Sequence, residues 1–177
     1  MNNETFELFF AMLSVATLIG TLVILAARTV FRSSSVGAAV VDGFRPFSRP
    51  LSAAIATTCM LGSLYFSEIV HYKPCRLCWM QRGAMYPLAV LLVIFTLAKT
   101  RNIGRIVVPI AAIGSCISMY HWLLERFPEN LDSGVCSKDV PCEFVWFEHF
   151  GFVTLPFMAL TGFLAIIVFN TLPSATE

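Results

Sequence analysis

The chain has 177 residues, of which 57% are hydrophobic and 13% are charged, whereas a soluble globular domain carries roughly 25% charged residues. With a mean hydropathy of +0.76, this composition excludes an ordinary soluble domain. The 12 basic and 11 acidic residues leave no basic surplus to neutralise nucleic-acid phosphates, so charge-driven binding of nucleic acid is also excluded.

Five apolar segments have about the length that a helix needs to cross a bilayer, roughly 20 residues at a rise of about 1.5 Å each. They are residues 8–27, 50–67, 79–98, 106–124 and 149–170. In lipid, such segments must satisfy their backbone hydrogen bonds internally, and none shows the alternation of a barrel strand. We therefore predict an all-α, polytopic membrane protein with five transmembrane helices.

The distribution of Lys and Arg predicts the orientation, because cytoplasmic connections carry an excess of both. Seven of these residues flank the first and third connections: Arg28, Arg32, Arg45, Arg49, Lys99, Arg101 and Arg105. The N-terminus is thus predicted outside and the C-terminus in the cytoplasm, with 33–48 as a cytoplasmic linker. We interpret the first segment as an uncleaved helix and not a signal peptide, because Glu4 and Glu7 occupy a region that a signal peptide would make basic.

The six cysteines fall into three pairs. Cys75 and Cys78, the helix pair, lie at the outer mouth of the third span, and Cys136 and Cys142, the loop pair, lie in the acidic outer loop. Both pairs are then on the oxidising side, where disulfides persist. The loop pair either orders its loop as a structural disulfide or exchanges with a partner's thiolate. The remaining two lie within spans and are interpreted as small buried hydrophobic residues: Cys59 and Cys116.

The helix pair has a physical reason to be reactive. Pro74 disfavours helix before it, and a helix running from about Cys78 would place free amide groups and its positive dipole end near the sulfurs, which favours thiolate. Arg82 follows Cys78 by one turn, and an Arg within an apolar span is usually functional. We interpret Arg82 as a cation that stabilises the Cys78 thiolate and polarises an oxygen of a bound acceptor. The alternative is a side chain that extends to the outer interface.

The motifs around these cysteines, over about residues 51–170, closely resemble the DsbB family of disulfide bond formation proteins, particularly its BdbC-type branch. The matching segments are Cys-Arg-Leu-Cys-Trp-Met-Gln-Arg (75–82), Met-Tyr-Pro (85–87), the loop pair, Phe-Gly-Phe-Val-Thr-Leu-Pro (150–156), Gly-Ser-Leu-Tyr-Phe-Ser-Glu (62–68) and Tyr-His (120–121). Two features depart from the family pattern. The first span is additional to its four helices, and Gln81 stands where some members carry Glu.

The resemblance implies a four-helix catalytic bundle at 50–177, preceded by a transmembrane helix and linker at 1–49. It implies an enzyme of the bacterial cytoplasmic membrane that supports protein folding, a thiol oxidase that regenerates a thioredoxin-fold, DsbA-like dithiol oxidase. Cys136 would form the mixed disulfide with the partner and Cys142 would complete the loop pair. Electrons would then pass to Cys75 and Cys78, and from Cys78 to a quinone (ubiquinone or menaquinone) beside Arg82. The expected partners are this oxidase, the quinone pool and membrane lipid, with no nucleic acid.

Three histidines and one carboxylate remain as candidates. His121 could hydrogen-bond a quinone oxygen or belong to an interfacial aromatic belt, and we keep it as a candidate cofactor-binding residue. His71 and His149 flank the cysteine loops as possible proton exchangers, though interfacial histidine is common, and Glu68 is interpreted as a boundary charge.

Two other classes of protein stay open. Four cysteines could hold a structural zinc ion as thiolates, or the outer disulfides could be purely structural. An enzyme of the vitamin K epoxide reductase type also combines a Cys-x-x-Cys with quinone, but there the loop pair precedes the Cys-x-x-Cys, whereas here it follows.

Overall fold

A computed structural model of the chain describes residues 3–98, 103–128, 136 and 140–172. Within these ranges the protein is helical, and the only extended pairing is an isolated bridge between His149 and Val153. The α-helices are α1 (Asn3–Thr29), α2 (Ser35–Phe44), α3 (Ser48–Leu64), α4 (Arg76–Leu97), α5 (Gly104–Arg126) and α6 (Leu155–Asn170). A 3-10 turn (Arg45–Phe47) precedes α3, and a π-helical segment (Tyr65–Ile69) continues it.

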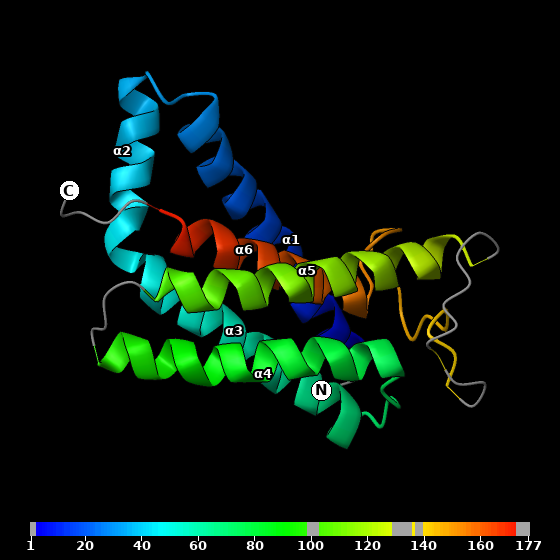
Figure 1. Cartoon of the computed structure of the whole chain (residues 1–177). Helices are drawn as coiled ribbons and strands as arrows, with labels where there is room; N and C mark the ends of the chain where they lie inside the picture. The colour runs from blue at the N-terminus through cyan, green and yellow to red at the C-terminus, as the bar shows by residue number, and fades with distance from the viewer. Residues whose placement is uncertain (1–2, 99–102, 129–135, 137–139, 173–177) are drawn as a thin grey trace.

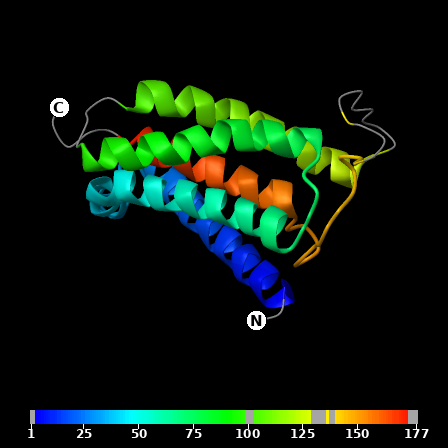
Figure 2. The same ribbon diagram turned by 90° about the horizontal axis from the view of Figure 1, so that it is seen from below.

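Helices α3 to α6 form a bundle in which α4 and α5 run side by side in opposite directions (Figures 1 and 2). Helix α1 packs on α6 and crosses the bundle obliquely (Figure 2). The N-terminal end of α4 and the C-terminal end of α5 lie at one end of the bundle. The opposite ends of both helices lie near α2 at the other end (Figure 1).

The predicted all-α membrane fold is confirmed. Helices α1, α4 and α5 are long and apolar enough to cross a membrane, and α6 is an apolar helix of 16 residues. Helix α3 reaches a comparable length only with its π-helical continuation. The chain is therefore a multi-pass membrane protein.

Two predicted segments differ from the observed helices. The predicted linker 33–48 contains α2, which begins after Ser34 because the Ser34 side chain accepts a hydrogen bond from the Gly37 amide.

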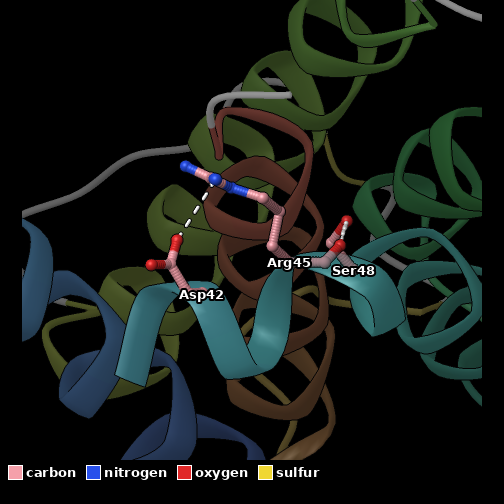
Figure 3. Close-up of polar contacts among 3 residues, drawn as sticks. All are labelled: Asp42, Arg45 and Ser48. Carbon is pink, nitrogen blue, oxygen red and sulfur yellow. Dashed lines mark hydrogen bonds and ion pairs between the residues drawn. The ribbon is translucent and has the colours of Figure 1, made fainter. Parts of the chain in front are cut away.

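Polar contacts also mark the other end of α2. Arg45 forms a 3.1 Å ion pair with Asp42, and the carbonyl oxygen of Arg45 accepts a hydrogen bond from the Ser48 hydroxyl (Figure 3).

The last predicted span, 149–170, becomes helical only at Leu155. Phe150 and Gly151 adopt positive φ angles of 56° and 73°, which a helix does not allow. Thr154 is an extended N-cap, and Pro156 follows in the first turn, where its missing N–H leaves no backbone hydrogen bond unmade. Residues 149–154 therefore form a tight turn that leads into α6.

Small residues allow the bundle helices to approach closely. Gly114 of α5 lies directly against the ring of Phe163 from α6, and Phe163 is fully buried. Ala56 of α3 and Ala111 of α5 are also fully buried in the same cluster, which includes Leu88 of α4. Close packing around small residues is the usual basis of helix association in membranes, and here it joins residues of α3, α4, α5 and α6 in one buried cluster.

Candidate redox site

Cys75 is the N-cap residue of α4. Its extended backbone follows from Pro74, which restricts the chain before the helix, and its sulfur accepts a 3.2 Å hydrogen bond from the Cys78 amide. The helix thus begins at Arg76, two residues earlier than the predicted Cys78. The sulfur atoms of Cys75 and Cys78 are 2.8 Å apart, so the helix pair occupies the positive end of the helix dipole as a closely spaced dithiol.

The loop pair, Cys136 and Cys142, forms a disulfide. Cys142 is buried with 2% of its surface exposed, whereas Cys136 is half-buried. The acidic outer loop therefore leaves one sulfur of the pair partly accessible and encloses the other. Cys142 packs in a buried cluster with Cys75, Leu77 and Leu124, against which Cys136 and Cys78 also pack. The two cysteine pairs therefore meet in one apolar cluster at the N-terminus of α4.

His121 of α5 lies between the two pairs and is buried. Its Nε2 is 3.6 Å from the Cys75 sulfur and 3.1 Å from the Cys142 carbonyl oxygen. A carbonyl only accepts hydrogen bonds, so Nε2 carries the proton. Nδ1 lies 3.1 Å from the Gln81 side-chain nitrogen, which donates to it. Gln81 thereby holds the imidazole with its proton aimed at the cysteine cluster.

The surroundings of Cys75 favour its ionised form. The hydrogen bond from the Cys78 thiol is the largest cause that lowers the pKa of Cys75, and His121 and the Cys78 amide lower it further, while burial opposes them. The pKa of Cys75 is therefore well below its ordinary value. These contacts favour the thiolate on Cys75, whereas Arg82 was predicted to stabilise a thiolate on Cys78.

Arg82 is held against α3. Its Nε donates to the Ser63 hydroxyl at 2.9 Å and its Nη2 donates to the Ser63 carbonyl oxygen at 3.1 Å. The guanidinium also lies 5.2 Å from the centre of the Trp79 ring. These contacts direct the cation into the protein, so the alternative of a side chain extended to the outer interface does not describe its position.

Next to Arg82 the helices enclose an apolar pocket of about 290 Å³. Cys78, Gln81 and Arg82 contribute to its wall from α4, and Ser63 and Cys59 contribute from α3. Its lining is mainly apolar: Phe10, Leu13, Ile55, Phe66, Met85, Tyr86, Trp146, Met158 and Phe163 belong to it. Cys78 thus belongs to the cysteine cluster and to this pocket at the same time.

Several predicted residues occupy other positions. His121 is not among the described residues that line the pocket, so its predicted hydrogen bond to a quinone oxygen has no support from its position. Cys59 is half-buried in the pocket wall, and Cys116 is exposed on α5, so interpreting Cys116 as buried was wrong. Its place on the bundle exterior is that of a lipid-facing side chain.

The other sequence candidates lie outside the cysteine cluster. His71 and Glu68 are exposed, and His71 has a left-handed backbone with a φ of 64°. His149 lies 3.7 Å from the Glu7 carboxylate of α1. Sequence reasoning did not identify the role of Gln81 in orienting His121, because a polar residue one turn from a cysteine gives no sign of a partner on another helix.

The four-thiolate zinc site does not fit this arrangement, because two of its sulfurs are joined in the loop-pair disulfide. Within the described residues, the group that could hold a metal is Cys75, Cys78 and His121, whose donor atoms lie within 4.8 Å of one another. The imidazole in this group is already engaged with Gln81 and the Cys142 carbonyl, which is the geometry of an oriented acid–base group.

Comparison with known proteins identifies the family of the chain. Residues 47–172 match the model of the family described as disulfide bond formation protein DsbB. The chain is 44% identical over 121 residues to disulfide bond formation protein C of Bacillus subtilis, covering 68% of this chain and 88% of that protein. It is 43% identical over 117 residues to a probable disulfide formation protein C of Halalkalibacterium halodurans, covering 66% and 85%. No solved structure matches the chain. The chain therefore belongs to the DsbB family of disulfide bond formation proteins.

Proposed function

We propose that this protein is a thiol oxidase that reoxidises a thioredoxin-fold, DsbA-like dithiol oxidase and delivers the electrons to a quinone. The observation that carries this proposal is the position of Cys78, which shares one cluster with the loop pair and also lines the apolar pocket beside Arg82. Electron transfer from an exchangeable disulfide to a lipid-soluble acceptor needs a cysteine that lies next to both the disulfide and the acceptor's binding site.

The first exchange begins at Cys136. A thiolate of the reduced partner attacks its sulfur, breaks the bond to Cys142 and forms a mixed disulfide. The second partner thiolate then attacks the partner sulfur of that mixed disulfide, so the partner leaves oxidised and the loop pair is left as a dithiol. Cys136 suits the attack because it is half-buried, whereas Cys142 has 2% of its surface exposed.

The second exchange reduces the helix pair. A loop-pair thiolate attacks Cys75, whose cluster it shares, and Cys78 leaves as a thiolate that lines the pocket with Arg82. The second loop-pair sulfur completes the exchange, so the loop pair is a disulfide again and the helix pair holds two electrons. His121 stabilises negative charge on Cys75 during this step, because its Nε2 proton faces that sulfur.

The pocket fits a quinone. Its apolar wall suits a flat ring, and Arg82 with Gln81 supplies hydrogen-bond donors at the end next to Cys78. When bound, a quinone supplies an acceptor for two electrons and two protons. Arg82 would hold negative charge that develops on the oxygen nearest Cys78, and the helix pair would return to its disulfide.

We also propose that both cysteine pairs face the outside of a bacterial cytoplasmic membrane, with the N-terminus outside and the C-terminus in the cytoplasm. The excess of Lys and Arg near the first and third connections supports this. Because the N-terminal end of α4 and the C-terminal end of α5 lie at one end of the bundle (Figure 1), a single orientation exposes both cysteine pairs to the same side. We propose that residues 50–177 form the catalytic bundle.

The test is quinone reduction by the purified protein, with a reduced thioredoxin-fold dithiol oxidase as donor and decylubiquinone as acceptor, followed by quinone absorbance. We expect loss of the quinone signal with the wild type, no catalysed loss with Cys78→Ser, and wild-type behaviour with Cys116→Ser, whose residue lies on the bundle exterior. No loss with wild type, or undiminished loss with Cys78→Ser, would contradict the proposal.

A further inference from the structure

Helix α1 lies outside the residues that match the family model, 47–172, yet it contributes one face to the apolar pocket. The contributing residues are Phe10, Leu13, Ser14 and Thr17. Their spacing of three, four and seven residues places them on one side of the helix. The remaining walls come from α3, α4, α6 and the loops beside them, so α1 closes a side that those elements leave unlined.

The middle of α1 is fixed against α3 and α6. Ser14 and Thr161 of α6 form a buried hydrogen bond of 3.0 Å between their hydroxyl oxygens. Ala11 is fully buried and packs with Val153 and Phe157. The ring of Phe10 lies so close to α3 that a Cβ at Gly62 would come within 2.9 Å of it. These contacts make α1 an integral wall and not a peripheral anchor.

The N-terminal end of α1 is attached to both segments that carry the cysteine pairs. Glu7 is 7% exposed, and its carboxylate accepts a 2.5 Å hydrogen bond from the Tyr72 hydroxyl. Its second oxygen lies 3.7 Å from Nε2 of His149. Tyr72 precedes Cys75 by three residues, and His149 follows the loop pair. Tyr72 also lines the pocket, so α1 contacts the pocket and its surrounding loops at once.

We propose that α1 is part of the quinone site of this protein and that Leu13 is a specificity-determining residue, limiting the size of the ring and tail that the pocket accepts. This inference rests on the proposed quinone function. Leu13 is suited to the role because it lines the pocket while 39% of its surface remains exposed. It therefore contacts the pocket while part of its side chain stays accessible from the exterior of the bundle.

The protein contains its own reporter for this site. Once the helix pair is also oxidised to a disulfide, the thiols that remain among the six cysteines are those of Cys59, in the pocket wall, and Cys116, on the bundle exterior. Alkylation by N-ethylmaleimide, read separately for each cysteine by mass spectrometry, measures occupancy without any enzymatic turnover. Decylubiquinone should slow alkylation of Cys59 in wild type in a concentration-dependent manner, and alkylation of Cys116 should not change.

The test compares Leu13→Trp with Ile19→Trp. Residue 19 is on the same helix, 57% exposed and outside the pocket lining. A Trp at residue 13 extends into the pocket, and we expect the decylubiquinone concentration that half-protects Cys59 to rise about tenfold or more. Ile19→Trp should keep the wild-type value. Leu13→Ala, which removes apolar contact without adding bulk, should raise the concentration a fewfold and keeps the test valid if the Trp variant fails to fold.

The outcomes separate the two proposals. If decylubiquinone does not protect Cys59 in wild type, the quinone site itself is wrong. If it protects wild type and both Leu13 variants equally, the quinone site stands and the role of α1 is wrong. An equal loss of protection in Ile19→Trp would also overturn the role of α1, because it would show a general effect of bulk on the helix.

Discussion

His121 Nε2 lies 3.6 Å from the sulfur of Cys75, which makes the imidazole a direct partner of the thiol at the N-terminus of α4. The same nitrogen donates to the carbonyl oxygen of Cys142, so one proton on one ring connects the two cysteine pairs. Substitution of His121 should therefore change the pKa of Cys75 more than it changes the fold of the bundle.

Removing the imidazole should raise the pKa of Cys75. In the reduced protein, the rate of Cys75 alkylation by iodoacetamide increases with pH as the thiolate forms. Because His121 is among the causes that lower this pKa, His121→Ala should move the midpoint of the pH profile upward by roughly one unit. His71→Ala is the control, since His71 is exposed and outside the cluster. An unchanged midpoint in His121→Ala would contradict the assigned contact.

Substitutions at Gln81 should shift the same midpoint in opposite directions. The Gln81 amide donates to Nδ1 of His121. A carboxylate can only accept, so Gln81→Glu requires a proton on Nδ1 and favours the imidazolium, which should lower the pKa of Cys75 further. Gln81→Leu removes the donor that orients the ring, and we expect the midpoint to rise. Shifts of the same sign in both variants would show that packing at residue 81, and not hydrogen bonding, determines the Cys75 pKa.

The bonding of Tyr72 can be measured by its own titration. Burial first, and then the hydrogen bond to Glu7, raises the pKa of Tyr72 from its ordinary 10.0 to about 12. A raised pKa means that the neutral phenol stabilises the folded protein fully below pH 10, and that this contribution is lost as the pH rises through 12. The tyrosinate absorbance of wild type minus Tyr72→Phe should show this titration. In Glu7→Gln its midpoint should fall but stay above 10, because burial remains, and an unchanged midpoint would contradict the Glu7 contact.

The packing of α5 on α6 predicts a difference between two glycines. A methyl group at Gly114 would collide with the buried ring of Phe163, whereas a Cβ at Gly83 of α4 would meet nothing within 4 Å. We expect Gly114→Ala to lower the free energy of unfolding by about 1 to 3 kcal/mol. Gly83→Ala should be neutral or stabilise by up to about 1 kcal/mol, because alanine favours helix. Thermal unfolding in one detergent compares the two, and equal melting temperatures would show that the ring moves aside.

Much of this organisation follows from hydropathy and spacing, which predict five apolar helices and the grouping of the cysteines. The observed structure differs from these predictions where contacts of single side chains determine the start of a helix or the side that a residue faces. The Cys75 side chain caps α4 and so starts the helix before Cys78, and Ser34 starts a helix in a segment whose polar and glycine residues resemble a linker. Cys116 was predicted to be buried but faces outward. Hydropathy does not distinguish the lipid-facing side of a helix from its packed side, so it could not predict this orientation.

Sequence spacing also does not reveal partners on different helices. Arg82 was identified because a charge within an apolar span is costly. The contact of His121 with Cys75, and that of Ser14 with Thr161, join residues far apart in the chain. Only the packing of α1, α4, α5 and α6 brings these side chains together, so the pocket wall formed by α1 could not be predicted from the sequence.

The order of exchange can be tested by trapping. If the partner's thiolate attacks Cys136, Cys142→Ser removes the loop-pair sulfur that would displace the partner. A Cys136 mixed disulfide should then accumulate when the variant is oxidised together with a partner that retains only its attacking cysteine. Cys136→Ser should trap little, because the remaining sulfur at residue 142 is 2% exposed in the native packing and its access is limited. Mass spectrometry of the crosslinked peptides identifies the attacked sulfur. Equal trapping through Cys142 would contradict the assignment, since the difference in exposure between the two sulfurs would then not control the site of attack.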